Sequence, residues 1–214
     1  MIGDQLRTIG AIINKNIVLT LWLSLSFSLF GQDWPELNRY RAHNAKLGLP
    51  AANEDRIVFM GNSITEGWST VLPEYFSGKS YVNRGISGQT TPQMLVRFRA
   101  DVIDLKPKAV VILAGTNDIA GNTGPATVKM IADNIISMAE LARENNILVV
   151  ISSVLPVYDY SWKPGLEPVP KISKLNEIIK NYALNHRHTY LDYYAAMVDD
   201  KKGLDEKYTS DGVH

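Results

Sequence analysis

The chain has 214 residues, of which 45% are hydrophobic and 21% are charged, which is enough for one sizeable globular domain. Its 22 basic residues balance 22 acidic ones without a Lys/Arg cluster, which argues against nucleic acid as a partner and against a polybasic membrane patch. Because the chain has no cysteine, a disulfide framework, a thiol nucleophile and a thiolate metal site are excluded.

The first 31 residues differ in composition from the rest of the chain. Arg7 and Lys15 precede an apolar run at 17–30, which is short for a membrane span of about 20 residues. Residues 1–31 are therefore predicted to be a signal peptide of a secreted or periplasmic protein, with no stable membrane association after cleavage. A retained membrane anchor is the alternative. Residues 32–55 are predicted to be a polar lead-in segment with one short helix.

From Arg56 onward, short apolar runs alternate with stretches of helical periodicity. Strands are predicted at 57–60, 80–83, 109–115, 147–155 and 189–194, and helices at 91–106, 125–145 and 170–186. Because the strands are continuously apolar, both of their faces are expected to be buried, which predicts a doubly wound parallel α/β sheet. Residues 158–171, rich in proline and aromatic residues, are predicted to form one long loop.

Polar and glycine-rich loops follow the first three predicted strands. Gly61, Asn62 and Ser63 follow the first strand, residues 84–88 follow the second, and residues 116–118 follow the third. Each loop by itself is typical of an ordinary turn. Ligands of such sheets bind beyond the carboxyl ends of the strands, so the three loops together predict one binding site.

Ser63 is a candidate nucleophile, which requires a base, a group that orients the base, and donors for an oxyanion. His214 follows Asp211 by three residues, a spacing that lets the carboxylate reach Nδ1 of the imidazole and leaves Nε2 facing a serine. No comparable partner accompanies the other three histidines, His43, His186 and His188.

Four segments in chain order resemble the sequence blocks of the SGNH or GDSL hydrolases: GNSIT at 61–65, GISGQTT at 85–91, GTND at 115–118 and DGVH at 211–214. The resemblance covers residues 56–214 and is closest to the branch of the platelet-activating-factor acetylhydrolase subunits and the carbohydrate acetylesterases. It implies a three-layer α/β/α sandwich with a flavodoxin-like sheet, and it implies no metal or cofactor.

The resemblance also implies roles for individual residues. Ser63 is the implied nucleophile, His214 the implied general base and Asp211 the group that orients it. The backbone N–H groups of Ser63 and Gly88 and the side-chain amide of Asn117 are the implied oxyanion hole.

Three positions depart from common patterns. Thr65 stands where the G-x-S-x-G elbow requires glycine, which excludes a typical α/β-hydrolase. Asn62 replaces the aspartate of the GDSL block and is expected to keep the hydrogen bonds of the loop. The chain ends on His214, where family members continue through a further helical segment, which predicts a truncated C-terminus.

The expected function is a serine esterase that hydrolyses short acyl esters, acetyl esters above all, through an acyl-enzyme. Acetylated carbohydrate is the first candidate substrate, because Tyr158, Tyr160 and Trp162 could stack on a sugar ring, although packing within the protein is an equal alternative for these rings. The alternatives are a lysophospholipase or thioesterase of the same family, and a non-catalytic carbohydrate-binding module on the same fold. The sequence leaves the oligomeric state open.

Overall fold

A computed structural model describes residues 33–214, so the predicted signal peptide at 1–31 lies outside the described residues. Within them, Pro35–His214 forms one compact unit. No helix in this part of the chain is both long and apolar enough to cross a membrane.

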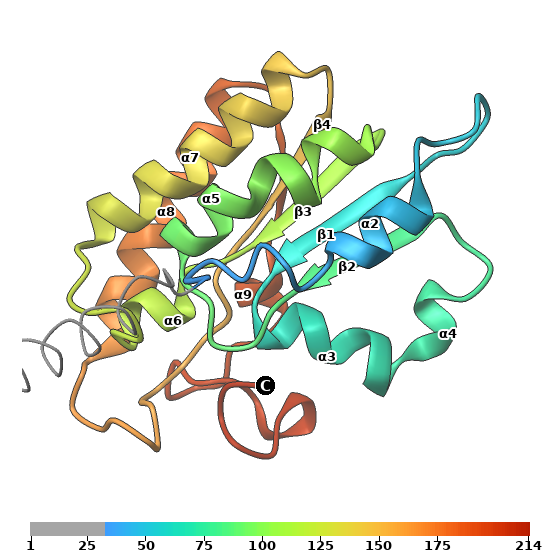
Figure 1. Ribbon diagram of the computed structural model, residues 1–214. Coiled ribbons are helices and arrows are strands. Elements are labelled where there is room, and N and C mark those ends of the chain that lie inside the picture. Colours follow the sequence, from blue (N-terminus) through green and yellow to red (C-terminus); the bar gives the residue numbers. More distant parts are fainter. Residues whose placement is uncertain (1–32) are drawn as a thin grey trace, which may run out of the picture. The chain divides into compact units, whose positions relative to one another are not determined.

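Five parallel strands form one sheet in the order β2-β1-β3-β4-β5 (Figure 1). The strands are β1 (Ile57–Gly61), β2 (Tyr81–Gly85), β3 (Ala109–Leu113), β4 (Leu148–Ser152) and β5 (Thr189–Leu191). Side chains on the central strands, such as Val58, Met60 and Ile112, are buried. This sheet confirms the predicted doubly wound parallel arrangement, and its strand order is the flavodoxin-like one.

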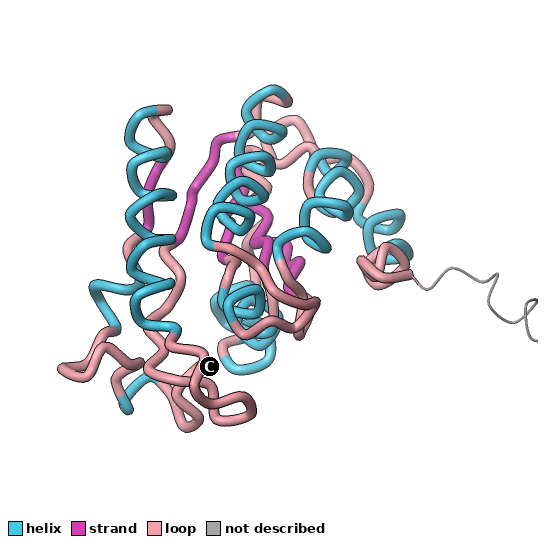
Figure 2. Tube along the Cα trace, turned by 90° about the vertical axis from the view of Figure 1, so that its left-hand side faces the viewer, coloured by secondary structure: helices cyan, strands magenta, loops and turns pink. Residues whose placement is uncertain are grey.

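Helices cover both faces of the sheet. On one face, α5 (Thr91–Asp101), α7 (Val128–Glu144) and α8 (Pro168–Asn185) pack side by side, as Figure 2 shows in a view turned by 90°. On the other face lie α3 (Ser63–Val71), α4 (Pro73–Phe76) and α9 (Tyr193–Met197) (Figure 1). The remaining helical segments of residues 33–214 are α2 (Arg41–Leu47), α6 (Thr116–Ile119), and the 3₁₀ turns η1 (Ile103–Leu105) and η2 (Glu206–Tyr208).

Two element boundaries differ from the sequence prediction, because at each of them a helix begins before the predicted strand or loop ends. The strand predicted at 189–194 ends at Leu191, since the Asp192 side chain accepts a hydrogen bond from the backbone N–H of Ala195 and caps α9. The loop predicted at 158–171 ends earlier, because Pro168 begins α8, a position that proline favours.

The helix α3 was not predicted, and it is the element that positions Ser63. The Asn62 side chain accepts a hydrogen bond from the backbone N–H of Ile64 at 3.1 Å and caps α3, so the helix begins directly at the end of β1. A Cβ atom on Gly85 would lie 2.1 Å from the backbone nitrogen of Glu66. Glycine at the end of β2 therefore lets α3 pack onto the carboxyl edge of the sheet.

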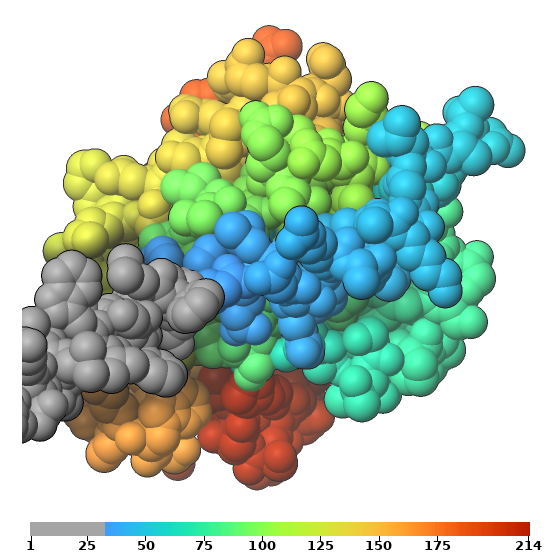
Figure 3. All heavy atoms as spheres, in the orientation of Figure 1, coloured from blue at the N-terminus to red at the C-terminus, as the bar shows by residue number. Residues whose placement is uncertain are grey.

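The lead-in segment lies across α5 on the surface of the unit, as the blue segment in Figure 3 shows. The Asn44 side chain donates hydrogen bonds to the backbone carbonyl of Ala100 at 3.1 Å and to the Asp101 carboxylate at 2.8 Å. The Tyr40 hydroxyl donates to the backbone carbonyl of Gly85. The lead-in segment thus reaches the end of β2.

Candidate active site

The structure brings Ser63, Asp211 and His214 together across 151 residues of chain. The Ser63 hydroxyl oxygen lies 2.9 Å from Nε2 of His214, and Nδ1 of His214 lies 2.6 Å from an Asp211 carboxylate oxygen. Both distances are within hydrogen-bonding range. The arrangement places a hydroxyl, an imidazole and a carboxylate in series, the order that a Ser-His-Asp triad requires.

A tight turn fixes Asp211 relative to His214. The second carboxylate oxygen of Asp211 accepts hydrogen bonds from the backbone N–H groups of His214 at 2.8 Å and Val213 at 2.9 Å, and from the Thr209 hydroxyl at 3.1 Å. Partial burial acts to raise the pKa of Asp211, but the hydrogen bonds from His214, Val213 and Thr209 outweigh it and hold the pKa well below its usual range. Asp211 is therefore ionised at neutral pH and can hold the proton of His214 on Nδ1, which leaves Nε2 free to accept one.

The three predicted oxyanion donors lie on the loops after β1, β2 and β3. The N–H of Ser63 belongs to the first turn of α3, so it has no partner within the helix. Asn117 is buried in α6, and its side-chain nitrogen donates to the backbone carbonyl of Gln89 at 3.0 Å. Because a primary amide carries two hydrogens, this contact orients the amide and leaves one hydrogen for a ligand.

Gly88 has a backbone conformation that favours glycine, with φ of 77°. Its carbonyl accepts a hydrogen bond from the Asn122 side chain at 3.1 Å. The neighbouring N–H of Ser87 donates to the Glu66 carboxylate at 2.8 Å, and the other Glu66 oxygen pairs with Arg39 at 2.7 Å. Sequence analysis missed Glu66, because its partner lies 21 residues away and only the packing of α3 brings the two together.

An apolar pocket of about 210 Å³ lies beside His214. Its walls come from α3, from the segment after β4 and from the C-terminal segment: Ile64, Trp68, Leu155, Tyr193, Met197 and Leu204. An apolar substituent of a substrate held at Ser63 can therefore be removed from water here.

The aromatic residues predicted to stack on a sugar occupy two different environments. Tyr160 is fully buried and its hydroxyl donates to the backbone carbonyl of Thr116 at 2.9 Å, so this ring packs within the protein, the alternative to stacking on a sugar. Tyr158 and Trp162 are 65% and 51% exposed. Lys163 in the same loop donates to the backbone carbonyl of Ala120 at 3.0 Å, which holds the loop against the segment that follows α6.

The other histidines lie elsewhere. His43 has a partner that the sequence does not indicate, because its Nδ1 lies 2.9 Å from the Arg84 guanidinium. His186 and His188 follow α8 and line a hollow with the first residues of β3 and β4. This hollow lies at the amino ends of the strands, whereas Ser63 lies at their carboxyl ends.

Asp118, next to Asn117, is buried and accepts hydrogen bonds from the backbone N–H of Thr91 at 3.0 Å and the Thr91 hydroxyl at 2.6 Å. Burial raises the pKa of Asp118 from 3.8 to about 6, although these hydrogen bonds oppose the rise. The contacts join α6 to the start of α5 and so connect the loop of Asn117 to that of Gly88.

We expect Asp118→Asn to change how stability depends on pH. A carboxyl whose pKa is raised by folding contributes stability that is fully present below its unfolded pKa and is lost as pH rises through its folded pKa of about 6. The free energy of unfolding of the unaltered protein, minus that of the variant, should therefore increase as pH falls from about 7 to about 4. Urea titrations across this range measure the difference, and a constant or falling difference contradicts the prediction.

Comparison with known proteins identifies the family. The model of the GDSL-like lipase/acylhydrolase family matches residues 59–214. The chain belongs to this family. Membership confirms the resemblance predicted from the four sequence blocks.

Solved structures of this GDSL-family hydrolase's relatives share its fold. A proposed acylhydrolase from Bacteroides fragilis is 49% identical, with a TM-score of 0.83 over 86% of this chain and 89% of that one. A GDSL-like lipase from Bacteroides thetaiotaomicron is 47% identical, with a TM-score of 0.82 over 84% and 89%. A proposed platelet activating factor from Streptococcus pneumonia is 25% identical, with a TM-score of 0.68 over 92% and 91%.

Curated relatives match a smaller part of the hydrolase. Esterase TesA of Pseudomonas aeruginosa is 31% identical over 99 residues, which is 44% of this chain and 48% of TesA. The lipoprotein YqeF of Bacillus subtilis, itself uncharacterised, is 29% identical over 136 residues, which is 56% of each chain. The chain thus spans about half the length of the curated relatives it matches.

Proposed function

We propose that the protein is a serine esterase that hydrolyses short acyl esters, acetyl esters above all, with acetylated carbohydrates as its substrate class. The observation that carries this proposal is the series of contacts from the Ser63 hydroxyl to Nε2 of His214 and from Nδ1 to Asp211. The signal-like composition of residues 1–31 supports a secreted or periplasmic location.

In the proposed reaction, His214 Nε2 takes the proton of Ser63 as its oxygen attacks the ester carbonyl. The N–H groups of Ser63 and Gly88 and the second hydrogen of the Asn117 amide donate to the oxyanion of the tetrahedral intermediate. His214 then gives its proton to the leaving alcohol, and the acyl group remains on Ser63. Water, deprotonated by His214, hydrolyses this ester and restores the serine.

Features of the surface around the site support the proposed substrate. Tyr158 and Trp162 expose aromatic rings on the loop that packs beside α6, where a sugar could stack on them.

The pocket beside His214 favours a second candidate, a lysophospholipase or thioesterase. A cavity that holds one water molecule has a volume of about 15 Å³. The pocket beside His214, at about 210 Å³, therefore has room for an apolar group larger than a methyl.

A hydrolysis screen tests the proposal. The full chain is assayed on p-nitrophenyl esters of increasing acyl length, on acetylated xylan and on acetylated sugars. We expect the highest kcat/KM on the acetyl ester, together with acetate release from an acetylated carbohydrate. A maximum at medium or long acyl chains favours the second candidate, and binding of carbohydrate by a well-folded chain that hydrolyses nothing favours the non-catalytic module.

Asn117→Ala is expected to lower kcat by about 10²- to 10³-fold, because one oxyanion donor is lost. The effect on KM should be smaller, since the lost contact is made mainly in the transition state. Steady-state kinetics on p-nitrophenyl acetate measure both constants. Asn145→Ala, at the exposed end of α7, is the matched control. A change in KM alone would show instead that Asn117 binds substrate.

A further inference from the structure

A buried guanidinium lies beneath the proposed oxyanion hole. Arg97 on α5 is fully buried, and only one carboxylate, that of Asp101 at 2.9 Å, is hydrogen-bonded to it within the described residues. Burial lowers the pKa of Arg97, and the hydrogen bond and charge of Asp101 oppose the effect. Burying a charged guanidinium costs free energy unless its N–H groups are hydrogen-bonded. The other hydrogen bonds of Arg97 therefore indicate what this arginine does in the structure.

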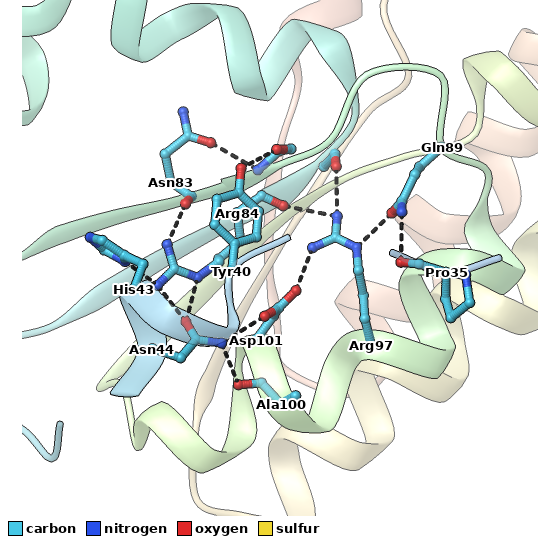
Figure 4. Close-up of polar contacts among 12 residues, drawn as sticks. Pro35, Tyr40, His43, Asn44, Asn83, Arg84, Gln89, Arg97, Ala100 and Asp101 are labelled. Atoms are coloured by element: carbon cyan, nitrogen blue, oxygen red, sulfur yellow. Dashed lines mark hydrogen bonds and ion pairs between the residues drawn. The ribbon is translucent and has the colours of Figure 1, made fainter. Parts of the chain in front are cut away.

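Those other contacts lead to loops of the site (Figure 4). Nη2 of Arg97 donates to the backbone carbonyl of Gly61 at 3.1 Å, two residues before Ser63, and to that of Arg84 at 2.9 Å, at the end of β2. Its Nε donates to the Gln89 side-chain oxygen at 2.6 Å. One planar group therefore fixes the ends of two neighbouring strands and the residue that follows Gly88.

Gln89 carries this contact to the third loop. It is buried, and its side-chain nitrogen donates to the backbone carbonyl of Pro35 at 2.8 Å, so both ends of its amide are held (Figure 4). Its own backbone carbonyl accepts the hydrogen bond from the Asn117 amide at 3.0 Å. The orientation of the Asn117 amide therefore depends on where Gln89 is held, and Arg97 helps to hold it.

We propose that Arg97, acting through Gln89 and the backbone carbonyl of Gly61, is the positioning residue that aligns the three oxyanion donors. The proposal rests on the proposed function, in which Ser63 is the nucleophile and Asn117 an oxyanion donor. Lysine cannot replace Arg97 in this role, since an ammonium on a flexible stem does not reproduce the planar fork that reaches all four acceptors.

A second buried arginine provides a matched control. Arg56 directly precedes β1, at the amino ends of the strands and so at the other end of the sheet from Ser63, and it is 1% exposed. Its guanidinium donates to the backbone carbonyls of Gly48 at 2.7 Å and Leu105 at 3.1 Å, and pairs with Glu54 at 2.7 Å. Arg56→Lys therefore removes a buried guanidinium of similar kind without touching a loop of the site.

The experiment compares Arg97→Lys, Gln89→Leu and Arg56→Lys on p-nitrophenyl acetate at a temperature where each is fully folded. We expect kcat to fall about 10- to 100-fold for the first two variants, with KM changed less than about twofold, because misplaced donors weaken transition-state binding. Arg56→Lys should lower the melting temperature and leave kcat unchanged.

A double-mutant cycle separates positioning from a general structural effect. If Arg97 acts through the oxyanion donors, Arg97→Lys should lower kcat much less in the Asn117→Ala background than in the unaltered protein. An equal loss in both backgrounds, or a kcat for Arg97→Lys that matches that of Arg56→Lys, overturns the proposal. Should Arg97→Lys not fold, the same double-mutant cycle is measured with Gln89→Leu in its place, and an equal loss of kcat in both backgrounds then overturns the proposal.

The two proposals fail in different ways. If Ser63→Ala retains the activity of the unaltered protein, the proposed function is wrong, whatever the arginine variants do. If Ser63→Ala is inactive while Arg97→Lys and Gln89→Leu keep full kcat, the proposed function stands and the positioning role of Arg97 is wrong.

Discussion

Ser63→Ala is expected to lower kcat by about 10⁵- to 10⁶-fold, since no acyl-enzyme can form without the hydroxyl. The melting temperature should change little, because the residue lies on the surface turn where α3 begins and loses one partly exposed hydrogen bond to His214. Kinetics on p-nitrophenyl acetate and covalent labelling with a fluorophosphonate probe measure the two expected consequences of losing this hydroxyl.

Ser69→Ala is the matched control for this variant. Ser69 lies on the same helix, is exposed and donates its hydroxyl to the backbone carbonyl of Glu66 at 3.0 Å. It should keep full activity and full labelling. A Ser63→Ala protein that still reacts with the fluorophosphonate would show that another residue is the nucleophile.

Asp211→Asn is expected to lower kcat by about 10⁴-fold. One carboxylate oxygen accepts from the backbone N–H groups of Val213 and His214, so the asparagine oxygen takes this place and its NH₂ group faces Nδ1. The amide then donates to Nδ1 and leaves the proton on Nε2. That tautomer cannot accept the proton of Ser63. Measurement of kcat across neutral and alkaline pH tests the prediction.

The control for the charge change is Asp205→Asn. Asp205 also accepts a hydrogen bond from a backbone N–H, that of Lys207 at 3.1 Å, and lies in the same C-terminal segment. Its replacement should leave kcat within about twofold. If Asp211→Asn retained activity comparable to that of Asp205→Asn, the orienting role of Asp211 would be refuted.

Features that depend on local sequence were predicted well. Continuous apolar runs identify β1, β3 and β4, because strands buried on both faces carry apolar residues at every position. Asp211 and His214 were predicted as a pair from a spacing of three residues, and the structure places their side chains 2.6 Å apart. In both cases the information lies within one short segment.

Features that depend on tertiary contacts were not predictable in the same way. The segment that forms α3 is only nine residues long and contains Gly67, and its start depends on the cap that Asn62 provides. The contacts of Glu66 with Ser87 and of Arg97 with Gly61 span 21 and 36 residues. The burial of Tyr160 depends on the packing of its loop onto Thr116, so the sequence alone left sugar stacking and packing open for this ring.

The compact turn that carries Asp211 and His214 is separate in sequence from most of the residues that line the pocket. Asp211 and His214 are held by hydrogen bonds within residues 209–214, whereas much of the pocket wall comes from the segment at 153–208: Leu155, Tyr193, Met197, Leu204 and Tyr208. Substitutions in that segment can reshape the pocket while the spacing of acid and base stays the same. The architecture therefore allows the shape of the pocket to vary in one region while the geometry of the Asp211–His214 pair is retained in another.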